Sequence, residues 1–180
     1  LTGREYERKD IKITVFLIIY GGGVGALASQ IGCSYDEAKS IRDAVLHAYP
    51  AIRALQRAVT SRGDRGDYVS TWGGRRYYAE PAKIVGGKTR RFSYKLLNYL
   101  IQGSAADQTK DCVIVWYNRR NETGAIFLAS VHDEINISVP KEVAVLGMIH
   151  LRESMDRDLF DVPMRSEGFM GSNWYDLKEA

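Results

Sequence analysis

Two carboxylates and an imidazole separate two apolar runs in the second half of the sequence. The run at 126–130 is followed by Val131-His132-Asp133-Glu134 and then by a second run at 135–139. Because burying a carboxylate is costly unless it is paired or binds a metal, we expect a hairpin that holds these groups at its exposed tip. Carboxylate oxygens suit hard ions such as Mg²⁺. The alternative interpretation of a lone His-Asp-Glu is an ordinary polar turn.

A second set of residues recurs at every fourth position near the start of the sequence. Arg8, Lys12, Phe16 and Tyr20 would form one stripe along a helix. Two cations followed by two aromatic rings suit a nucleoside triphosphate, because cations bind phosphates and rings pack on a base and sugar. A half-buried helix with a solvated cationic end is the alternative.

Two amides with the same spacing form the third set. Asn98 and Gln102 precede Gly103. Amide side chains can donate to the N3 and O2 acceptors of the DNA minor groove, which every correctly paired base pair presents. Such contacts check geometry without reading sequence, although two amides that bond to local backbone are an equally simple interpretation.

Composition sets the limits for these candidates. The 180 residues are 45% hydrophobic and 26% charged, which excludes disorder for most of the chain, and two cysteines exclude a disulfide scaffold. No apolar run approaches the roughly 20 residues of a membrane span. Residues 1–100 hold 17 Lys+Arg and 9 Asp+Glu, a balance of +8, whereas residues 101–180 hold 8 and 13, a balance of −5. This asymmetry predicts one face for polyanions, unless the charges are scattered by chance.

The elements that would position these residues follow from periodicity and turn signals. Residues 8–20 are ambiguous between a helix and a buried strand, and Gly21 to Gly25 is a break. Ser34 and Glu37 have capping-box spacing, so they open a helix. The remaining pattern predicts helices at 34–49, 50–61, 89–117 (weak at Gly103) and 141–160, hairpins at 68–79 and 126–139, loops at 62–67, 81–88 and 118–124, and a strand at 164–170. This order indicates an α+β fold.

A nucleotide-binding fold of another kind is the first rival. Gly21, Gly23 and Ala26 after an apolar run match a loose dinucleotide fingerprint. That fold needs a strand–helix–strand unit, and the pattern after Ala26 is helical instead. The Cys and His residues are too scattered for a zinc site.

Taken together, the motifs resemble the family A (polymerase I-like) DNA polymerases. The match runs in family order over nearly the whole chain. The motifs are Arg8-x-x-x-Lys12-x-x-x-Phe16-x-x-x-Tyr20-Gly21 (motif B of the fingers), Trp72-Gly73-Gly74-Arg75-Arg76-Tyr77 (the Gly-Arg-Arg hairpin), Asn98-x-x-x-Gln102 (the minor-groove helix), Val131-His132-Asp133-Glu134 (motif C of the palm) and Gly171-x-x-Trp174 (the C-terminal motif).

The resemblance implies roles on the nucleotide side of a site. Arg8 and Lys12 would bind the triphosphate and steady the leaving pyrophosphate, with Lys12 acting in catalysis. Phe16 would pack near the sugar and Tyr20 near the templating position.

On the other side of the site, the resemblance implies that Asp133 and Glu134 hold catalytic Mg²⁺ and that His132 approaches the primer end. The reaction would be attack of a primer 3′-hydroxyl on the α-phosphate of a dNTP, with two metals on the attacking and leaving oxygens. The residues expected to contact primer–template DNA are His132, Asn98, Gln102, Arg75 and Arg76.

The sequence departs from the family at several points. Val15 and Leu17 stand where the family usually has Asn and Gly, and Tyr94 stands where an Arg is common. Motif A, with the first metal-binding Asp, does not occur. We therefore expect the C-terminal part of a right-hand polymerase, with fingers helices at 1–66 and an antiparallel palm portion at 67–180. The two-metal site would be completed by an upstream segment or a separate N-terminal chain, without which we expect no activity.

Two further rivals remain open. Single-subunit phage-type RNA polymerases share the Lys-to-Tyr spacing and a His-Asp hairpin, although they usually have Ser where Glu134 stands. A non-catalytic accessory chain could bind primed DNA through the basic first half. In each case we expect no membrane partner and a place in the cytoplasm of a bacterial or phage-infected cell.

Overall fold

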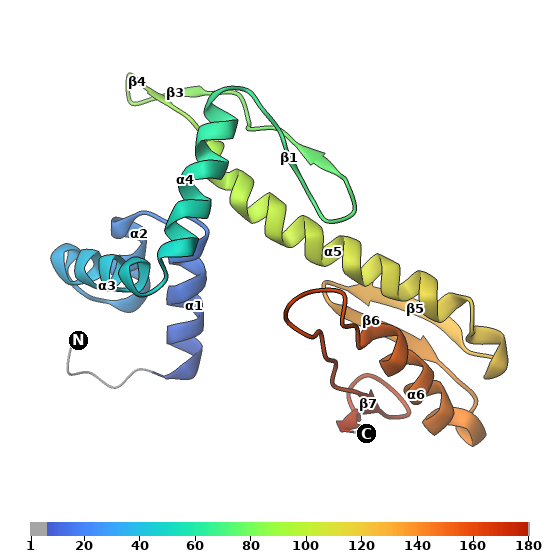
Figure 1. The fold of residues 1–180 in the computed structure, drawn as a ribbon. Coiled ribbons are helices and arrows are strands. Elements are labelled where there is room, and N and C mark those ends of the chain that lie inside the picture. The colour runs from blue at the N-terminus through green and yellow to red at the C-terminus, as the bar shows by residue number, and fades with distance from the viewer. Residues whose placement is uncertain (1–6, 180) are drawn as a thin grey trace. The chain divides into compact units, whose positions relative to one another are not determined.

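The fold is known from a computed structural model, which describes residues 7–179. The chain divides into two compact units, Leu1–Gly103 (the first unit) and Ser104–Ala180 (the second unit). Helices alternate with four small antiparallel sheets of two strands each among the described residues, which confirms the α+β class (Figure 1). The division into fingers and palm at residue 66 concerns function and stays a prediction.

The first unit begins with helices α1 (Arg8–Ile19), α2 (Val24–Ile31), α3 (Tyr35–Ala48) and α4 (Pro50–Asp64). The ambiguous segment at 8–20 is therefore a helix. The sequence pattern missed α2, and the predicted loop at 62–67 is partly wrong because α4 continues to Asp64. The start of α3 is confirmed, since the Ser34 hydroxyl accepts a hydrogen bond from the Glu37 amide at 3.2 Å.

A small apolar core joins the first three helices. Ile18, Leu27 and Ala38 are each at most 2% exposed and pack together. The fourth helix is tied to this core by Gln56, whose amide nitrogen donates to the carbonyl oxygens of Ile18 and Ile19 at 2.8 and 2.7 Å. These carbonyls end α1 and have no partner within it, so the contact satisfies groups that a helix terminus leaves open.

Two hairpins follow α4. The first is confirmed, with β1 (Val69–Ser70) paired to β2 (Arg76–Tyr77). The predicted loop at 81–88 is wrong, because β3 (Lys83–Val85) pairs with β4 (Lys88–Arg90). Gly86 and Gly87 form its turn with φ of 58° and 74°, which favours a tight type I′ hairpin. The helix expected from 89 begins only after this strand and the 3₁₀ turn η1 (Ser93–Lys95).

Helix α5 (Leu96–Tyr117) supplies its first turns to the first unit and the rest to the second. Leu96 and Leu97 are almost fully buried with Val59 and Val69. The expected weak point at Gly103 is wrong, since the helix is continuous there. Gly103 instead permits close approach, because a Cβ atom at this position would lie 2.7 Å from Thr71 Cγ2 of the β1–β2 turn.

The second unit surrounds the hairpin of β5 (Ile126–Val131) and β6 (Glu134–Ser138), which confirms the expected pair of strands. Trp116 is 1% exposed, and its ring centroid lies 6.3 Å from that of Phe127. The other elements of this unit are the 3₁₀ turns η2 (Arg120–Glu122) and η3 (Lys141–Val143), helix α6 (Ala144–Met155), and strands β7 (Phe169–Met170) and β8 (Lys178–Glu179).

Two expectations for the second unit are corrected. The helix predicted at 141–160 starts as a 3₁₀ turn and ends at Met155. The strand predicted at 164–170 is reduced to β7, while Met164 forms only an isolated bridge with Arg157. Within residues 7–179, no helix combines the length and the apolar character needed to cross a membrane.

We predict that Gly103→Ala lowers the free energy of unfolding by about 1–2 kcal/mol, because the overpacking against Thr71 and Tyr77 exceeds the gain in helix propensity. Urea denaturation measures this change. Gly25→Ala is the matched control, since a Cβ there meets nothing within 4 Å and the position is helical. It should stabilise the chain slightly, and stabilisation by Gly103→Ala as well would contradict the close packing.

A second prediction concerns Glu80, which follows β2. Its Oε1 accepts hydrogen bonds from Lys95 Nζ at 2.8 Å and from Tyr99 Oη at 2.7 Å. These bonds hold the pKa of the Glu80 carboxyl below its usual range and raise the pKa of Lys95 and of Tyr99. A carboxyl with a lowered folded-state pKa stabilises the fold fully above its unfolded-state pKa, and this stabilisation is lost as pH falls through the folded value.

Glu80→Gln should therefore lower Tm near neutral pH, and the difference from the unchanged chain should shrink as the solution is acidified below the usual range of a carboxyl group. Thermal melts over a series of acidic buffers test this. A difference in Tm that stays constant throughout the series would contradict it.

Candidate nucleotide and primer–template site

The stripe expected on the first helix is present on α1. Arg8 is its first residue and is exposed, as is Lys12 one turn later. The rings of Phe16 and Tyr20 are stacked with centroids 5.9 Å apart and planes inclined by 19°. Lys12 Nζ lies 5.8 Å from the Phe16 ring centroid. The helix thus presents a cationic end and an adjoining aromatic platform, the arrangement that a nucleotide requires.

A hydrogen bond links this stripe to the pair of amides on α5. Gln102 Nε2 donates to Tyr20 Oη at 2.8 Å, although the two residues are 82 positions apart. Asn98 lies one turn earlier on the same helix and is half-buried. Two of the three residue sets identified in the sequence therefore meet within the first unit.

The arginines of the first hairpin are also exposed. The Arg76 guanidinium lies 4.6 Å from the centroid of the Tyr68 ring, and Arg75 Nη1 donates to Tyr77 Oη at 3.3 Å. The Arg75 amide donates to Thr71 Oγ1 at 3.1 Å and so holds the turn. Both guanidinium groups remain accessible to an anion from solvent.

The carboxylates of the second unit lie at the tip of the β5–β6 hairpin. Val131 pairs with Glu134, so His132 and Asp133 form a two-residue turn. His132 has a φ of 56°, the one positive φ among non-glycine residues at 7–179. Such a conformation is unusual outside glycine and is characteristic of residues held in place for function. All three side chains of His132, Asp133 and Glu134 are exposed.

The donor set at this tip suits a hard divalent cation but is incomplete. Asp133 and Glu134 offer carboxylate oxygens, and neither forms an ion pair with a residue that the structure describes. Within the described chain, no three His, Cys, Asp or Glu side chains gather closely enough to hold a metal. The two carboxylates fit one part of a magnesium site, and further ligands are needed.

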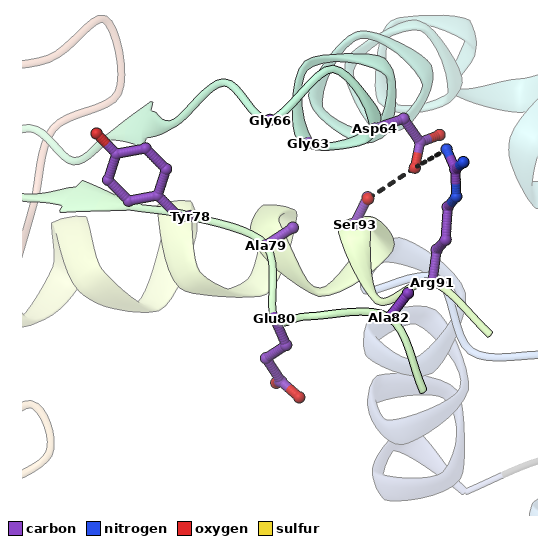
Figure 2. Close-up of a pocket in the computed structure, with 9 residues that line it drawn as sticks. All are labelled: Gly63, Asp64, Gly66, Tyr78, Ala79, Glu80, Ala82, Arg91 and Ser93. Atoms are coloured by element: carbon purple, nitrogen blue, oxygen red, sulfur yellow. Dashed lines mark hydrogen bonds and ion pairs between the residues drawn. The ribbon is translucent and has the colours of Figure 1, made fainter. Parts of the chain in front are cut away.

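Sequence reasoning missed a hollow at the base of the β3–β4 hairpin, with a volume of about 370 Å³. Figure 2 shows Asp64 at one wall, where its Oδ1 accepts a hydrogen bond from Ser93 Oγ at 2.7 Å and lies 3.8 Å from Arg91 Nη1. Glu80 lines the other side. The Gly86-Gly87 pair between two short runs of Lys, Ile, Val and Thr is a hairpin signal that could have located this region.

The comparisons with known proteins give the family. The sequence profile of DNA polymerase family A matches residues 3–176, so the chain belongs to this family. The thermostable DNA polymerase I of Thermus aquaticus is 29% identical over 174 residues, covering 96% of this chain and 21% of that protein. The DNA polymerase of Mycobacterium phage D29 is also 29% identical, over 183 aligned positions, covering 100% of this chain and 28% of that protein.

A solved structure agrees with this assignment. The POL domain of Pol1 from M. smegmatis, in complex with DNA primer-template and dNTP, superposes with a TM-score of 0.71 at 27% identity. The match covers 88% of this chain and 29% of that chain. The chain spans about a fifth of the length of the thermostable relatives it matches.

The Tyr20–Gln102 bond gives a prediction that needs no substrate. In a double-mutant cycle of Tyr20→Phe and Gln102→Ala, the free energies of unfolding should deviate from additivity by about 0.5–1 kcal/mol, because each single variant already removes the bond. Chemical denaturation provides the four values. The pair Tyr20→Phe and Asn98→Ala is the control and should be additive; additivity in both cycles would show that the bond contributes nothing.

Proposed function

We propose that this chain takes part in template-directed DNA synthesis, in which a dNTP is added to a primer 3′ end. Membership of DNA polymerase family A carries this proposal, together with the stripe on α1 and the carboxylates on the β5–β6 tip. The DNA and dNTP bound by the M. smegmatis POL domain are the substrates we assign to it. Its place of action would be the cytoplasm of a bacterial or phage-infected cell, where such DNA is replicated.

On the nucleotide side, Arg8 and Lys12 would bind the triphosphate and neutralise charge on the departing pyrophosphate. Phe16 would pack against the sugar. Tyr20 would lie near the templating base, and its stacking on Phe16 supports a shared platform for both contacts. Since Gln102 donates to Tyr20, a change in the minor groove at the primer end would be felt by the residue that faces the template.

On the primer side, the 3′-hydroxyl oxygen forms a bond to the α-phosphorus, the bond to the bridging oxygen breaks, and pyrophosphate leaves. Asp133 and Glu134 would hold Mg²⁺, which when bound stabilises the charge on the attacking and leaving oxygens. His132 would contact the primer end, and Asn98, Gln102, Arg75 and Arg76 would hold the duplex.

The remaining metal ligand would come from a segment outside residues 1–180, either upstream in the same protein or on a partner chain. Apolar exposure supports this proposal. Ile126 and Leu128 of β5 are 64% and 61% exposed, and the two strands of this sheet pair only with each other among the described residues. An apolar strand with an open edge is a surface that normally packs against further chain.

Primer extension tests the proposal. We expect no extension by the 180-residue chain alone, and extension with Mg²⁺ and four dNTPs once a polymerase segment that carries motif A is added. Asp133→Asn should reduce this activity by at least about 100-fold, because loss of a metal ligand should exceed the effect of losing an outer-shell partner.

Asp161→Asn is the matched control, since Asp161 is an exposed carboxylate of the same unit outside the tip. Activity that survives Asp133→Asn would favour a non-catalytic DNA-binding role. Extension by the unsupplemented chain would refute the need for an outside ligand, and preference for rNTPs would favour an RNA polymerase.

A further inference from the structure

The β3–β4 hairpin carries an unbalanced positive charge. Residues 81–92 contain Lys83, Lys88, Arg90 and Arg91 and no Asp or Glu. The strand register pairs Lys83 with Arg90 and Val85 with Lys88. Side chains of directly paired residues share a face, as do those two positions apart on a strand. Lys83, Lys88 and Arg90 therefore lie on one face, whereas Ile84 and Thr89 lie on the other.

This arrangement is unfavourable for the chain by itself. Like charges directly opposite each other destabilise an antiparallel pair, and a lone two-stranded hairpin is marginal in water. Within residues 7–179, β3 and β4 form no sheet with other strands. Two apolar side chains are also left in solvent, since Ile84 is 79% exposed and Val85 52%. A bound polyanion would relieve the repulsion and cover this face.

The base of the hairpin is nevertheless fixed on both sides. Before β3, Glu80 accepts hydrogen bonds from Lys95 and Tyr99. After β4, Ser93 and Arg91 contact Asp64 at the end of α4, as Figure 2 shows. In Figure 1 the two hairpins of the first unit leave the end of α4 in different directions. The cationic arm thus projects from an anchored base.

The charges that face the arm leave three cations available. Arg91 is engaged by Asp64, and Glu80 attracts Lys83 only weakly, as the smallest contribution to its own lowered pKa. Arg90 lies 5.7 Å from the centroid of the Phe92 ring, an interaction that leaves its donors open. Neither Lys83 nor Lys88 forms an ion pair with a described residue.

We propose that the β3–β4 hairpin binds the sugar–phosphate backbone of the primer–template duplex through Lys83, Lys88 and Arg90. This inference rests on the proposed function, which supplies duplex DNA as the polyanion. Side-chain cations on a projecting arm contact phosphates without reading bases, so the contact is independent of sequence. It adds a second anchor for DNA, separate from the minor-groove amides on α5.

The salt dependence of DNA binding tests this proposal. Each phosphate contact adds about 0.9 to the slope of log K against log salt for duplex DNA. In the triple variant Lys83→Gln, Lys88→Gln, Arg90→Gln, we expect the slope to fall by about 2–3 and affinity near 0.1 M salt to fall at least about tenfold. A labelled primer–template in a fluorescence anisotropy titration gives both values.

The matched control removes three exposed cations elsewhere, through Lys39→Gln, Lys141→Gln and Arg152→Gln. It makes the same change in net charge, so an equal loss of affinity in both variants would reduce the effect to overall charge and overturn the proposal. The hairpin variant should fold normally, since it removes repulsion; an unchanged or higher Tm checks this.

A tethered probe tests the contact without removing any charge. Val85 shares the cationic face and is exposed, so Val85→Cys in a Cys33→Ser background can carry an iron chelate that cleaves nearby DNA. We expect cuts within a narrow window of the duplex. The same probe at Tyr35→Cys, which is 61% exposed on α3, should give no such window.

The outcomes separate this proposal from the proposed function. Primer–template binding with an unchanged slope in the triple variant, or with no cuts from position 85, would overturn the hairpin contact alone. Cuts only in the single-stranded template overhang would also overturn the assignment to duplex. No binding of primed DNA by the unchanged chain would refute both.

Discussion

Close packing along helix α5 is the constraint on which the other elements depend. Its first turn buries Leu96 and Leu97 in one apolar cluster, and its last turns bury Cys112 and Trp116 in another. Between these clusters, Gly103 lets the β1–β2 hairpin approach the helix backbone. One helix thereby positions the hairpin with the two arginines, the amide that bonds Tyr20, and the β5–β6 hairpin that carries the carboxylates. Burial on several sides explains why α5 has no single apolar stripe in its sequence.

Local signals explain most of what the sequence predicted correctly. The cap at Ser34 and the apolar runs on both sides of His132-Asp133 each specify an element through neighbouring residues. The segment at 8–20 stayed ambiguous, because a continuous apolar run suits a buried strand as well as a helix. Its four-residue stripe was the better guide, since it reported the face on which Phe16 and Tyr20 stack. Motif spacing therefore located the site residues more reliably than it located element boundaries.

Contacts between distant residues account for what the sequence left out. The bond from Gln102 to Tyr20 and the packing of Thr71 on Gly103 have no periodicity that a single sequence reveals. The β3–β4 hairpin was missed for another reason. Its strands are short and rich in Lys and Arg, so propensity favoured a loop, and only the two glycines with positive φ marked the turn. The helix expected from 89 also failed there, because Thr89 and Arg90 belong to a strand.

The charge asymmetry of the sequence gains a physical meaning from the ion pairs. Carboxylates of the second unit that lie away from the tip are largely paired, as Asp111 is with Arg157 and Asp158 with Arg165. The tip carboxylates, Asp133 and Glu134, have no such partners among the described residues. Exposed carboxylates stay hydrated at little cost, so a cation can bind them without first breaking an ion pair. Exposed cations on β3 and β4 are equally available to a polyanion. The excess charge of each half is therefore concentrated where the proposed function places a ligand of the opposite sign.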